Sequence, residues 1–367
     1  MAETRNPLEA TGRTLGWGIV ATGAIARKVT PDIAALEDAR LIGVSSRSQA
    51  SADEFATDFG VERAYADDDA RTGYEKLLAD PDVDVVYIAT PHGQHHSNML
   101  EAIRAGKNIV CEKAFTITEN EAREVLDAAR EKGVFVMEGL WTRFHPLRAR
   151  VSELLEAGEI GMPRWVQADL GFRGPADKSH RLWREDAGGG GLLDMACYVL
   201  HWPWLALGRP TGFTAQTIKR GNVDALTQIT GTFEKSAAQM TISLVSQGPR
   251  QAVISGHDGF ITIGSPMHQA QSFTVTDSQG SVREESWPLV GRGYSYEMRE
   301  ATRCIQEGAL ESPIMPWDDT IAQMEMLDGI RRQIGVVYPD HDGDARNQPA
   351  RSSAGHRVRR SRGEVAT

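Results

Sequence analysis

Two pairs of side chains in this sequence combine a carboxylate with a second group able to hold a proton, as acid–base chemistry requires. In the first pair, Glu112 and Lys113 end an apolar run that starts at Ile109. Burying an ammonium within a strand is costly unless the group is paired or its pKa falls. At the carboxyl end of a parallel strand, however, Lys113 would point into the crevice where open α/β sheets bind ligands.

The second pair, Asp194 and Tyr198, follows four consecutive glycines at positions 188–191. If these glycines open a helix, the two side chains lie one turn apart on the same face. A carboxylate and a phenol at the mouth of such a loop could bind and protonate an alcohol or a carbonyl. Considered in isolation, the pair is better explained by a buried tyrosine and an acidic residue near a helix N-terminus.

The turn after the first apolar run has the spacing of a dinucleotide-binding fingerprint. Ala21, Gly23 and Ala26 align with its three glycine positions, so Ala21 is a departure from the pattern. Gly23 would let the backbone approach a pyrophosphate at a helix N-terminus, where N–H groups and the helix dipole favour anions. Cofactor binding is favoured over a plain tight turn, because the motif lies at the first strand–helix junction. The residues predicted to bind the cofactor here are Ala21, Thr22, Gly23, Ala24 and Ile25.

The second predicted strand ends in Ser46 and Arg47, with no acidic residue before Asp53. An acid at this place binds the ribose hydroxyls of NAD, whereas an arginine accommodates the 2′-phosphate of NADP. The alternative is that Ser48 caps the next helix and Arg47 is solvated, which is compatible with phosphate binding. The sequence therefore favours NADP, with NAD possible.

Thr90 and Pro91 stand at the end of the predicted strand 83–90 and would lie at the carboxyl edge of the sheet. His95 lies at or near the next helix start. The histidines at positions 92, 95 and 96 have no acidic or cysteine partner at a recognisable metal-ligand spacing. We therefore predict cofactor contacts from Thr90, Pro91 and His95, and no metal site.

These residues require a scaffold that brings strand ends together. From residue 15 to about 137, apolar strands alternate with amphipathic helices, which predicts a parallel, doubly wound sheet. After about residue 150, alternating strands follow one another without helices, which indicates a mostly antiparallel sheet with one buried face. The predicted strands lie at 15–21, 39–46, 83–90, 107–113, 134–139 and in several runs between 164 and 280.

The sequence thus predicts an α/β protein in two parts. Residues 14–140 form a Rossmann domain and residues 141–338 an α+β domain with an open sheet, closed by helices near 295–308 and 317–335. Residues 339–367 are polar with an arginine-rich end, which favours a disordered tail over contact with nucleic acid or phosphate.

Composition restricts the partners. The 367 residues include 50 acidic and 40 basic side chains, and the formal charge of −10 argues against nucleic-acid binding. Three cysteines without Cys-x-x-Cys spacing indicate neither a disulfide framework nor a structural zinc site. We find no signal-peptide core and no apolar run long enough for a membrane span, so we predict a cytoplasmic protein that does not contact membranes.

Taken together, the motifs resemble the glucose-fructose oxidoreductase/inositol dehydrogenase family, also called Gfo/Idh/MocA, as far as about residue 338. Their order is specific: the fingerprint, Thr90-Pro91 with His95, "AGKNIVCEK", and the glycines before Asp194 and Tyr198. "CEKAF", "EGLWTRFHP" and a tyrosine rather than a histidine at position 198 are most similar to the dimeric dihydrodiol dehydrogenase and NADP-dependent D-xylose 1-dehydrogenase branch.

The resemblance implies a substrate pocket between the two domains and a homodimer or higher homo-oligomer formed through the open sheet. The family's catalytic lysine corresponds to Lys113, its nicotinamide-side glutamate to Glu112, and its helix-borne acid and proton carrier to Asp194 and Tyr198. Position 114 is alanine where the family usually has proline. A cis bond before alanine costs about 3 kcal/mol, so a trans bond is the default expectation.

The resulting hypothesis is an NADP-dependent oxidoreductase that interconverts a secondary alcohol or hemiacetal and its carbonyl on a pyranose sugar or a cyclic trans-diol. Lys113 would hold the reacting oxygen, Tyr198 would relay its proton, and Asp194 would orient a hydroxyl or the lysine. Two alternatives remain: a non-catalytic NADP-binding sensor, or an enzyme that cleaves glycosides through transient oxidation by a tightly bound cofactor. Ordinary packing is an equal alternative for the predicted substrate contacts, Trp141, Arg143, Phe144, His180, Arg181 and Trp183.

Overall fold

The computed structural model describes residues 6–342. Its first half is a six-stranded parallel sheet in the order β3-β2-β1-β4-β5-β6, the order of a dinucleotide-binding doubly wound fold. The strand β1 is buried along its whole length, as expected for a sheet that helices cover on both faces. The predicted Rossmann architecture is confirmed. Its strands are β1 (Leu15–Val20), β2 (Ala39–Ser46), β3 (Arg63–Ala66), β4 (Val85–Ile88), β5 (Asn108–Glu112) and β6 (Val136–Gly139).

Helices connect these strands, and their ends follow from local sequence. A capping box between Thr118 and Glu121 begins α5, and Gly133 ends that helix in the left-handed conformation. The helices α4 and α5 pack together, while α1 packs against α8 from the far end of the chain. The helices of this half are α1 (Ala24–Ala34), α2 (Gln49–Phe59), α3 (Gly73–Ala79), α4 (His95–Arg104) and α5 (Glu119–Lys132).

The second half is built on an eight-stranded sheet in the order β14-β13-β12-β11-β7-β10-β9-β8. Within the described part of this sheet, β7–β10 is the one parallel pair and all other neighbouring strands are antiparallel, so the predicted mostly antiparallel sheet is confirmed. The strands are β7 (Trp165–Gly171), β8 (Gly212–Arg220), β9 (Val223–Thr232), β10 (Ala237–Ser243), β11 (Ala252–Ser255), β12 (Gly259–Ile263), β13 (Ser272–Asp277) and β14 (Val282–Ser286).

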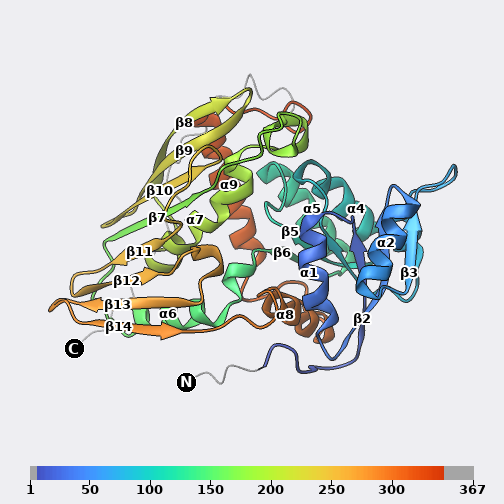
Figure 1. Cartoon of the computed structure of the whole chain (residues 1–367), viewed down its shortest axis with the longest axis horizontal. Coiled ribbons are helices and arrows are strands. Elements are labelled where there is room, and N and C mark those ends of the chain that lie inside the picture. Colours follow the sequence, from blue (N-terminus) through green and yellow to red (C-terminus); the bar gives the residue numbers. More distant parts are fainter. Residues whose placement is uncertain (1–5, 343–367) are drawn as a thin grey trace, which may run out of the picture.

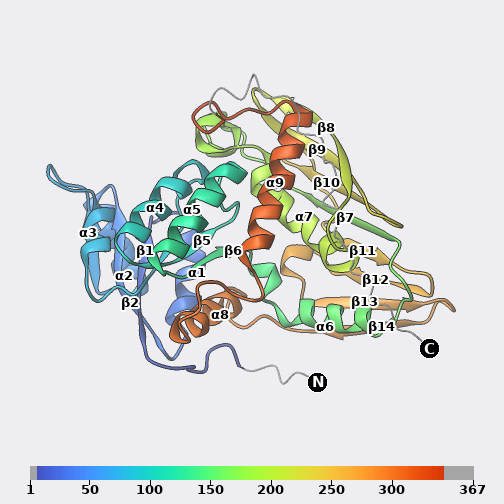
Figure 2. The same ribbon diagram turned by 180° about the vertical axis from the view of Figure 1, so that it is seen from behind.

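One face of this sheet is covered and the other is open. The helix α7 (Gly191–Leu207) packs on β7, β9 and β10, and residues along β9 alternate between buried and exposed. Figures 1 and 2 show α9 (Trp317–Ile334) standing between the two sheets. The helix α8 (Ser295–Gln306) returns to the parallel sheet, so the last two helices connect both halves rather than one.

The remaining elements are short. The helix α6 (Pro146–Glu156) precedes β7, and single 3₁₀ turns occupy His92–Gln94, Trp141–Arg143, Arg181–Trp183, Glu185–Ala187 and Met267–Gln269. Within residues 6–342, no helix is long and apolar enough to cross a membrane.

Three elements were not predicted. The segment of β3 has only four residues and is half-buried, and β14 is a charged, exposed edge strand, so neither has the apolar pattern of a strand. The helix α3 is a single short element after an acidic loop. The predicted tail begins too early, because packed chain continues to Asp342; residues 343–367, with their arginines, lie outside the described part.

Candidate active site

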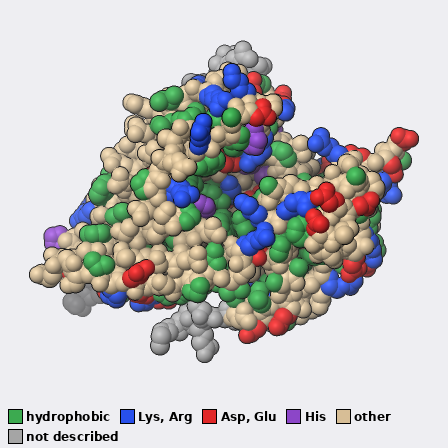
Figure 3. Space-filling view, in the orientation of Figure 1, with side chains coloured by type: hydrophobic (Ala, Val, Ile, Leu, Met, Phe, Trp, Pro, Cys, Tyr) green, Lys and Arg blue, Asp and Glu red, His purple; other side chains and the backbone are tan. Residues whose placement is uncertain are grey.

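A cavity of about 1170 Å³ lies between the carboxyl edge of the parallel sheet and the inner face of the second sheet. Figure 3 shows it as a hollow between the two halves of the molecule. Ligands of open α/β sheets bind at this edge, where the strand order reverses between β1 and β4. The cavity is therefore in the place predicted for a cofactor and a substrate.

The fingerprint turn fits a pyrophosphate. Gly23 begins α1 without a side-chain cap, so the N–H groups of the first turn are left for a ligand. No atom lies within 4 Å of the point where a Cβ on Gly23 would be. Ala21 has φ of +81°, a conformation natural to glycine, which explains why this position is normally glycine. The predicted residues from Ala21 to Ile25 all line the cavity.

The end of β2 forms the outer rim of the same cavity. Ser46 and Arg47 line it together with Thr72 and Tyr74. The Arg47 side chain is exposed and makes no hydrogen bond or ion pair to other described residues. Ser48 occupies the N-cap position of α2, but its side chain makes no capping bond. The Arg47 guanidinium can therefore reach a 2′-phosphate without first breaking another contact.

Two histidines after β4 form hydrogen bonds to backbone carbonyl groups of neighbouring loops. His95 is fully buried between the carbonyl oxygens of Thr90 and Ala114, each 2.9 Å from a ring nitrogen. Thr90 and Pro91 line the cavity, but His95 does not, so its predicted cofactor contact is corrected to a structural one. His92 lies between the carbonyls of Lys113 (3.2 Å) and Gly188 (3.1 Å), and burial lowers its pKa to about 3.

Lys113 lies at the end of β5, and the bond from Lys113 to Ala114 is cis, contrary to the default expectation. Its Nζ donates a 2.6 Å hydrogen bond to the backbone carbonyl of Asp194 and lies 4.9 Å from the ring centroid of Tyr198. Burial alone would lower the pKa of Lys113, but the charge of Asp194 and of other neighbours raises it above its ordinary value. The side chain is therefore an ammonium at neutral pH.

Glu112 precedes the lysine and is buried. The hydroxyl of Tyr87 donates to its Oε1 at 2.6 Å, and burial raises the pKa of the carboxyl. Asp194 instead accepts a 3.0 Å bond from Arg181. Burial would raise the pKa of Asp194, but the charges of Lys113 and Arg181 lower it to about 2. Asp194 is thus a charged, oriented carboxylate.

Tyr198 is held as a hydrogen-bond donor. Its oxygen accepts a 2.9 Å bond from the indole Nε1 of Trp141, which in turn stacks on Tyr294 at 4.4 Å. A phenol has one proton to donate. Because the Tyr198 oxygen accepts the bond from Trp141, this proton remains available for a group bound in the cavity. Burial raises the pKa of Tyr198 well above its ordinary value, so the proton is retained.

The Gly-rich loop sets the start of α7. Gly190 has φ of +106°, and a Cβ there would lie 2.3 Å from an oxygen of buried Asp224. Asp224 accepts the N–H of Leu192 at 2.8 Å, so glycine lets the loop close on this carboxylate. The hydroxyl of Tyr338 donates to the Gly189 carbonyl of the same loop.

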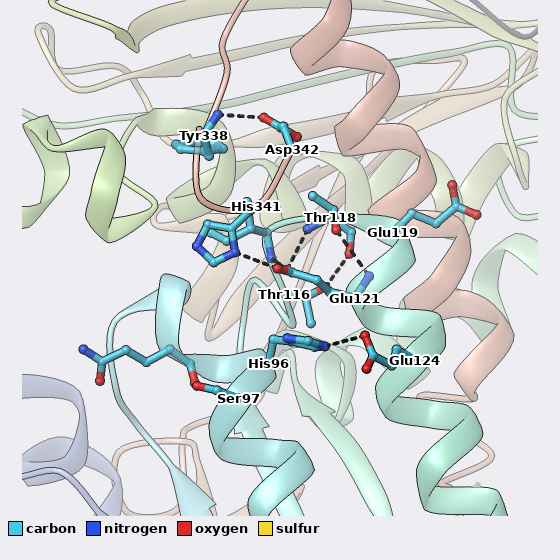
Figure 4. Close-up of polar contacts among 12 residues, drawn as sticks. His96, Ser97, Thr116, Thr118, Glu119, Glu121, Glu124, Tyr338, His341 and Asp342 are labelled. Carbon is cyan, nitrogen blue, oxygen red and sulfur yellow. Dashed lines mark hydrogen bonds and ion pairs between the residues drawn. The ribbon is translucent and has the colours of Figure 1, made fainter. Parts of the chain in front are cut away.

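The segment 336–342, here called the C-terminal strap, brings Tyr338 to that loop. Figure 4 shows His341 of the strap against Glu121 of α5, at 2.6 Å, and Asp342 accepting from the backbone of Tyr338. The carboxylate of Asp342 also pairs with Arg331 of α9. The strap thereby links α5, α9 and the glycine loop that precedes Asp194.

Three of the six predicted substrate contacts line the cavity: Trp141, His180 and Arg181. The other three do not. Arg143 pairs with Asp319 at 2.6 Å, Phe144 is buried in the core, and Trp183 packs under Arg220. The reason is geometric, since Trp141–Arg143 and Arg181–Trp183 are 3₁₀ turns, in which successive side chains point about 120° apart.

Several lining residues were missed because no motif carries them. They come from separate segments that only the fold brings together: Lys28, Leu170, Phe172, Arg250, His268, Gln269 and Tyr294. His92 was considered only as a metal ligand and rejected. Its place directly after Pro91, at the end of a parallel strand, was the signal that could have marked it as a site residue. Within residues 6–342, no group of three or more potential ligands is placed to hold a metal ion.

Comparison with known proteins agrees with this geometry. Residues 15–140 match the model of the GFO/IDH/MocA oxidoreductase family, NAD-binding Rossmann fold, and residues 149–262 match the GFO/IDH/MocA C-terminal domain. The chain is 33% identical to a D-xylose 1-dehydrogenase (NADP(+)) of Hypocrea jecorina, with 89% of this chain and 94% of that protein covered. It is also 33% identical to a trans-1,2-dihydrobenzene-1,2-diol dehydrogenase of Mus musculus, covering 89% and 98%.

Solved structures show the same fold. An aldose-aldose oxidoreductase from Caulobacter crescentus, complexed with glycerol, superposes with a TM-score of 0.79 at 26% identity, covering 88% of this chain and 97% of that one. A 3-ketoreductase from Actinomadura kijaniata, in complex with NADP, has a TM-score of 0.78 at 23% identity, covering 88% and 98%.

Proposed function

The chain belongs to the GFO/IDH/MocA family of oxidoreductases, and from this premise we propose that it interconverts a secondary alcohol or hemiacetal and its carbonyl on a pyranose sugar or a cyclic diol. It is an NADP-dependent enzyme that acts on CH–OH groups. One observation carries the assignment: two proton-holding groups, Lys113 and Tyr198, face one cavity beside the fingerprint turn.

When bound, NADPH supplies a hydride to the carbonyl carbon, and NADP⁺ accepts one from the alcohol carbon. The residues of the chain handle the oxygen and its proton. One N–H of the Lys113 ammonium donates to the backbone carbonyl of Asp194, which leaves two N–H groups for the reacting oxygen. Tyr198 has its hydroxyl proton free for the same oxygen. Preoriented donors of this kind stabilise the negative charge that develops on an oxygen in the transition state.

Both groups retain their protons at neutral pH, since the pKa of each is raised. In carbonyl reduction, one of them delivers the proton that the new hydroxyl needs. In alcohol oxidation, the substrate proton has to leave through the same pair to water, so oxidation should become faster as the pH rises. The charged Asp194 holds Arg181 at the substrate wall and orients it toward a neighbouring hydroxyl.

The cofactor would be held by the groups described above. The first turn of α1 would bind the pyrophosphate, and Ser46 with Arg47 would bind the 2′-phosphate. Thr90, Pro91 and Glu112 line the cavity at the strand ends and would hold the nicotinamide part of the cofactor. No acidic residue lies between the end of β2 at Ser46 and Asp53, which supports NADP over NAD.

A homodimer formed through the open face of the eight-stranded sheet belongs to the same proposal. Trp165, Phe260 and Val282 are exposed there at 42, 39 and 66%. Cross-strand pairing through Ser255 and Thr276 places all three on one face. An exposed apolar row of this length is a usual feature of a protein interface.

The three cysteines are free and buried, which supports a reducing compartment such as the cytoplasm.

The test is a panel of neutral and acidic pyranoses and cyclic trans-diols, each incubated with NADP⁺ while reduced nicotinamide is followed by absorbance. Turnover with NADP⁺ on at least one member supports the proposal. A tightly retained cofactor with no turnover of added NADP⁺ would favour glycoside cleavage. Tight binding of free NADP with neither reaction, on substrates in either direction, would favour a sensor.

A further inference from the structure

Arg250 is a lining residue that the proposed mechanism does not use. It follows β10 in the loop to β11, and its half-buried side chain borders the cavity with Tyr198 and His268. Its backbone carbonyl binds the N–H of Met267, and the ring of the next residue, His268, lies 5.1 Å from that of Tyr198, so Arg250 lies near the substrate end of the cavity. Its guanidinium makes no hydrogen bond or ion pair to any residue in the described range 6–342.

The backbone of Arg250 is held in an unusual conformation. Its φ is +59°, and apart from Ala21 it is the only non-glycine residue with positive φ among the described residues. Asp169 of β7 accepts the Arg250 N–H at 2.9 Å, and the Arg250 carbonyl accepts the N–H of Met267 at 2.8 Å. A strained position that is fixed on both sides is a reason to look for a role of its side chain.

The substrate end of the cavity has a surplus of positive charge. Four carboxylates line the whole cavity: Asp67 and Glu101 come from the outer part of the parallel-sheet half, whereas Asp194 binds Arg181 and Glu112 binds Tyr87. Lys28 and Arg250 have no ion pair within the described part of the chain. Figure 3 shows lysine and arginine atoms on both walls of the hollow, with few acidic atoms between them. Besides Arg47, the cations that line the cavity are Lys28, Lys113, Arg181 and Arg250.

We propose that the substrate ring carries an anionic group, a carboxylate or a phosphate, and that Arg250 binds it. This inference rests on the proposed function, since it concerns the substrate of the same cavity. A guanidinium matches the two oxygens of such a group with parallel N–H bonds. Its backbone is already fixed by two hydrogen bonds before the ligand arrives, so binding orders only the side chain and not the loop at this residue.

The cofactor phosphates do not provide an equal explanation. The expected pyrophosphate site is at the start of α1 and the expected 2′-phosphate site at the end of β2, whereas Arg250 lies in the β10–β11 loop of the second half, hydrogen-bonded to Met267. A neutral hydroxyl would leave the positive charge uncompensated in a partly buried site. Charge-assisted bonds exceed neutral ones enough to give an anionic substrate about a tenfold to hundredfold advantage.

The experiment compares ligands that share a ring and differ in charge. Calorimetry measures D-glucose, D-glucuronate and D-glucose 6-phosphate binding to the protein–NADP⁺ complex at constant ionic strength. The variants are Arg250→Met, which keeps length but removes charge, and Arg250→Lys, which restores the charge. Arg332→Met, an exposed arginine on α9 outside the cavity, is the matched control.

We expect at least one anionic sugar to bind about tenfold or more tightly than glucose. Arg250→Met should remove this preference and leave NADP⁺ affinity unchanged, and Arg250→Lys should keep part of it. Whether glucuronate or glucose 6-phosphate gains more identifies the anion as carboxylate or phosphate. Glucose binding as tightly as both anions, or a preference that survives Arg250→Met, would overturn the inference. Turnover is measured separately, so inactivity would count against the proposed function and not against the anion site.

Discussion

Glu138 offers a quantitative test of the buried electrostatics behind the active site. It lies on β6 at 1% exposure, and its Oε1 accepts a 3.1 Å bond from Gln323. Its other oxygen has no partner among the described residues. Burial raises the pKa of this carboxyl to about 7, although the charge of Arg143 acts in the lowering direction.

The sign of the effect follows from linkage. With a folded pKa near 7 and an unfolded value near 4.5, the native state binds more protons than the unfolded chain between these pH values. The stabilisation is therefore complete below about pH 4.5 and is lost as the pH rises to about 7. At about 1.4 kcal/mol per pKa unit, the loss amounts to about 3 kcal/mol.

Glu138→Gln cannot ionise, so the variant should lack this component of the pH dependence. Urea unfolding followed by circular dichroism at pH 5, 6, 7 and 8 gives the unfolding free energies. The difference in unfolding free energy, variant minus parent, should rise by about 2 to 3 kcal/mol from pH 5 to pH 8. Glu131→Gln, on the exposed face of α5, should show no such trend. A constant difference for Glu138→Gln across this range would refute the reasoning.

Three further outcomes are expected. Arg47→Ala should weaken NADP binding about tenfold to hundredfold while NAD binding changes little, because a charge-assisted phosphate contact is worth about 1.5 to 3 kcal/mol; equal losses for both cofactors in fluorescence titrations would contradict this. Tyr338→Phe leaves the Gly189 carbonyl without its donor and should cost about 1 to 3 kcal/mol of stability, read from the urea midpoint; an unchanged midpoint would show that the strap does not hold the loop. Trp165→Glu on the open sheet face should convert the proposed dimer to a monomer by light scattering, whereas a monomeric parent would remove the dimer proposal.

The parallel sheet was predictable because strands buried on both faces, such as β1 and β4, are continuous apolar runs. The strand β3 was not, since its four half-buried residues resemble a loop. The second sheet showed period-2 alternation clearly enough to predict its type, although its order depends on long-range pairing that no local pattern records.

The site residues also divide into those that local sequence predicted and those that depend on the tertiary fold. Lys113 and Tyr198 lie at a strand end and on a helix face, where sequence spacing determines direction. Arg143 and Trp183 were misplaced because tight 3₁₀ turns point neighbouring side chains apart. Arg250 and His268 lie in loops whose approach to the cavity depends on how the second sheet packs, so no motif could identify them.

The central claim is that Lys113 and Tyr198 handle the proton of the reacting oxygen. Its most direct test is the turnover number of Lys113→Met, Tyr198→Phe and the double variant on a substrate found in the panel, with NADP affinity measured in parallel. Each single change should lower turnover about 10² to 10⁴-fold with NADP affinity retained, and the double variant should be little worse than the poorer single, because the two residues act on one oxygen. A folded, NADP-binding Lys113→Met protein that turns over at nearly the parent rate would contradict the claim.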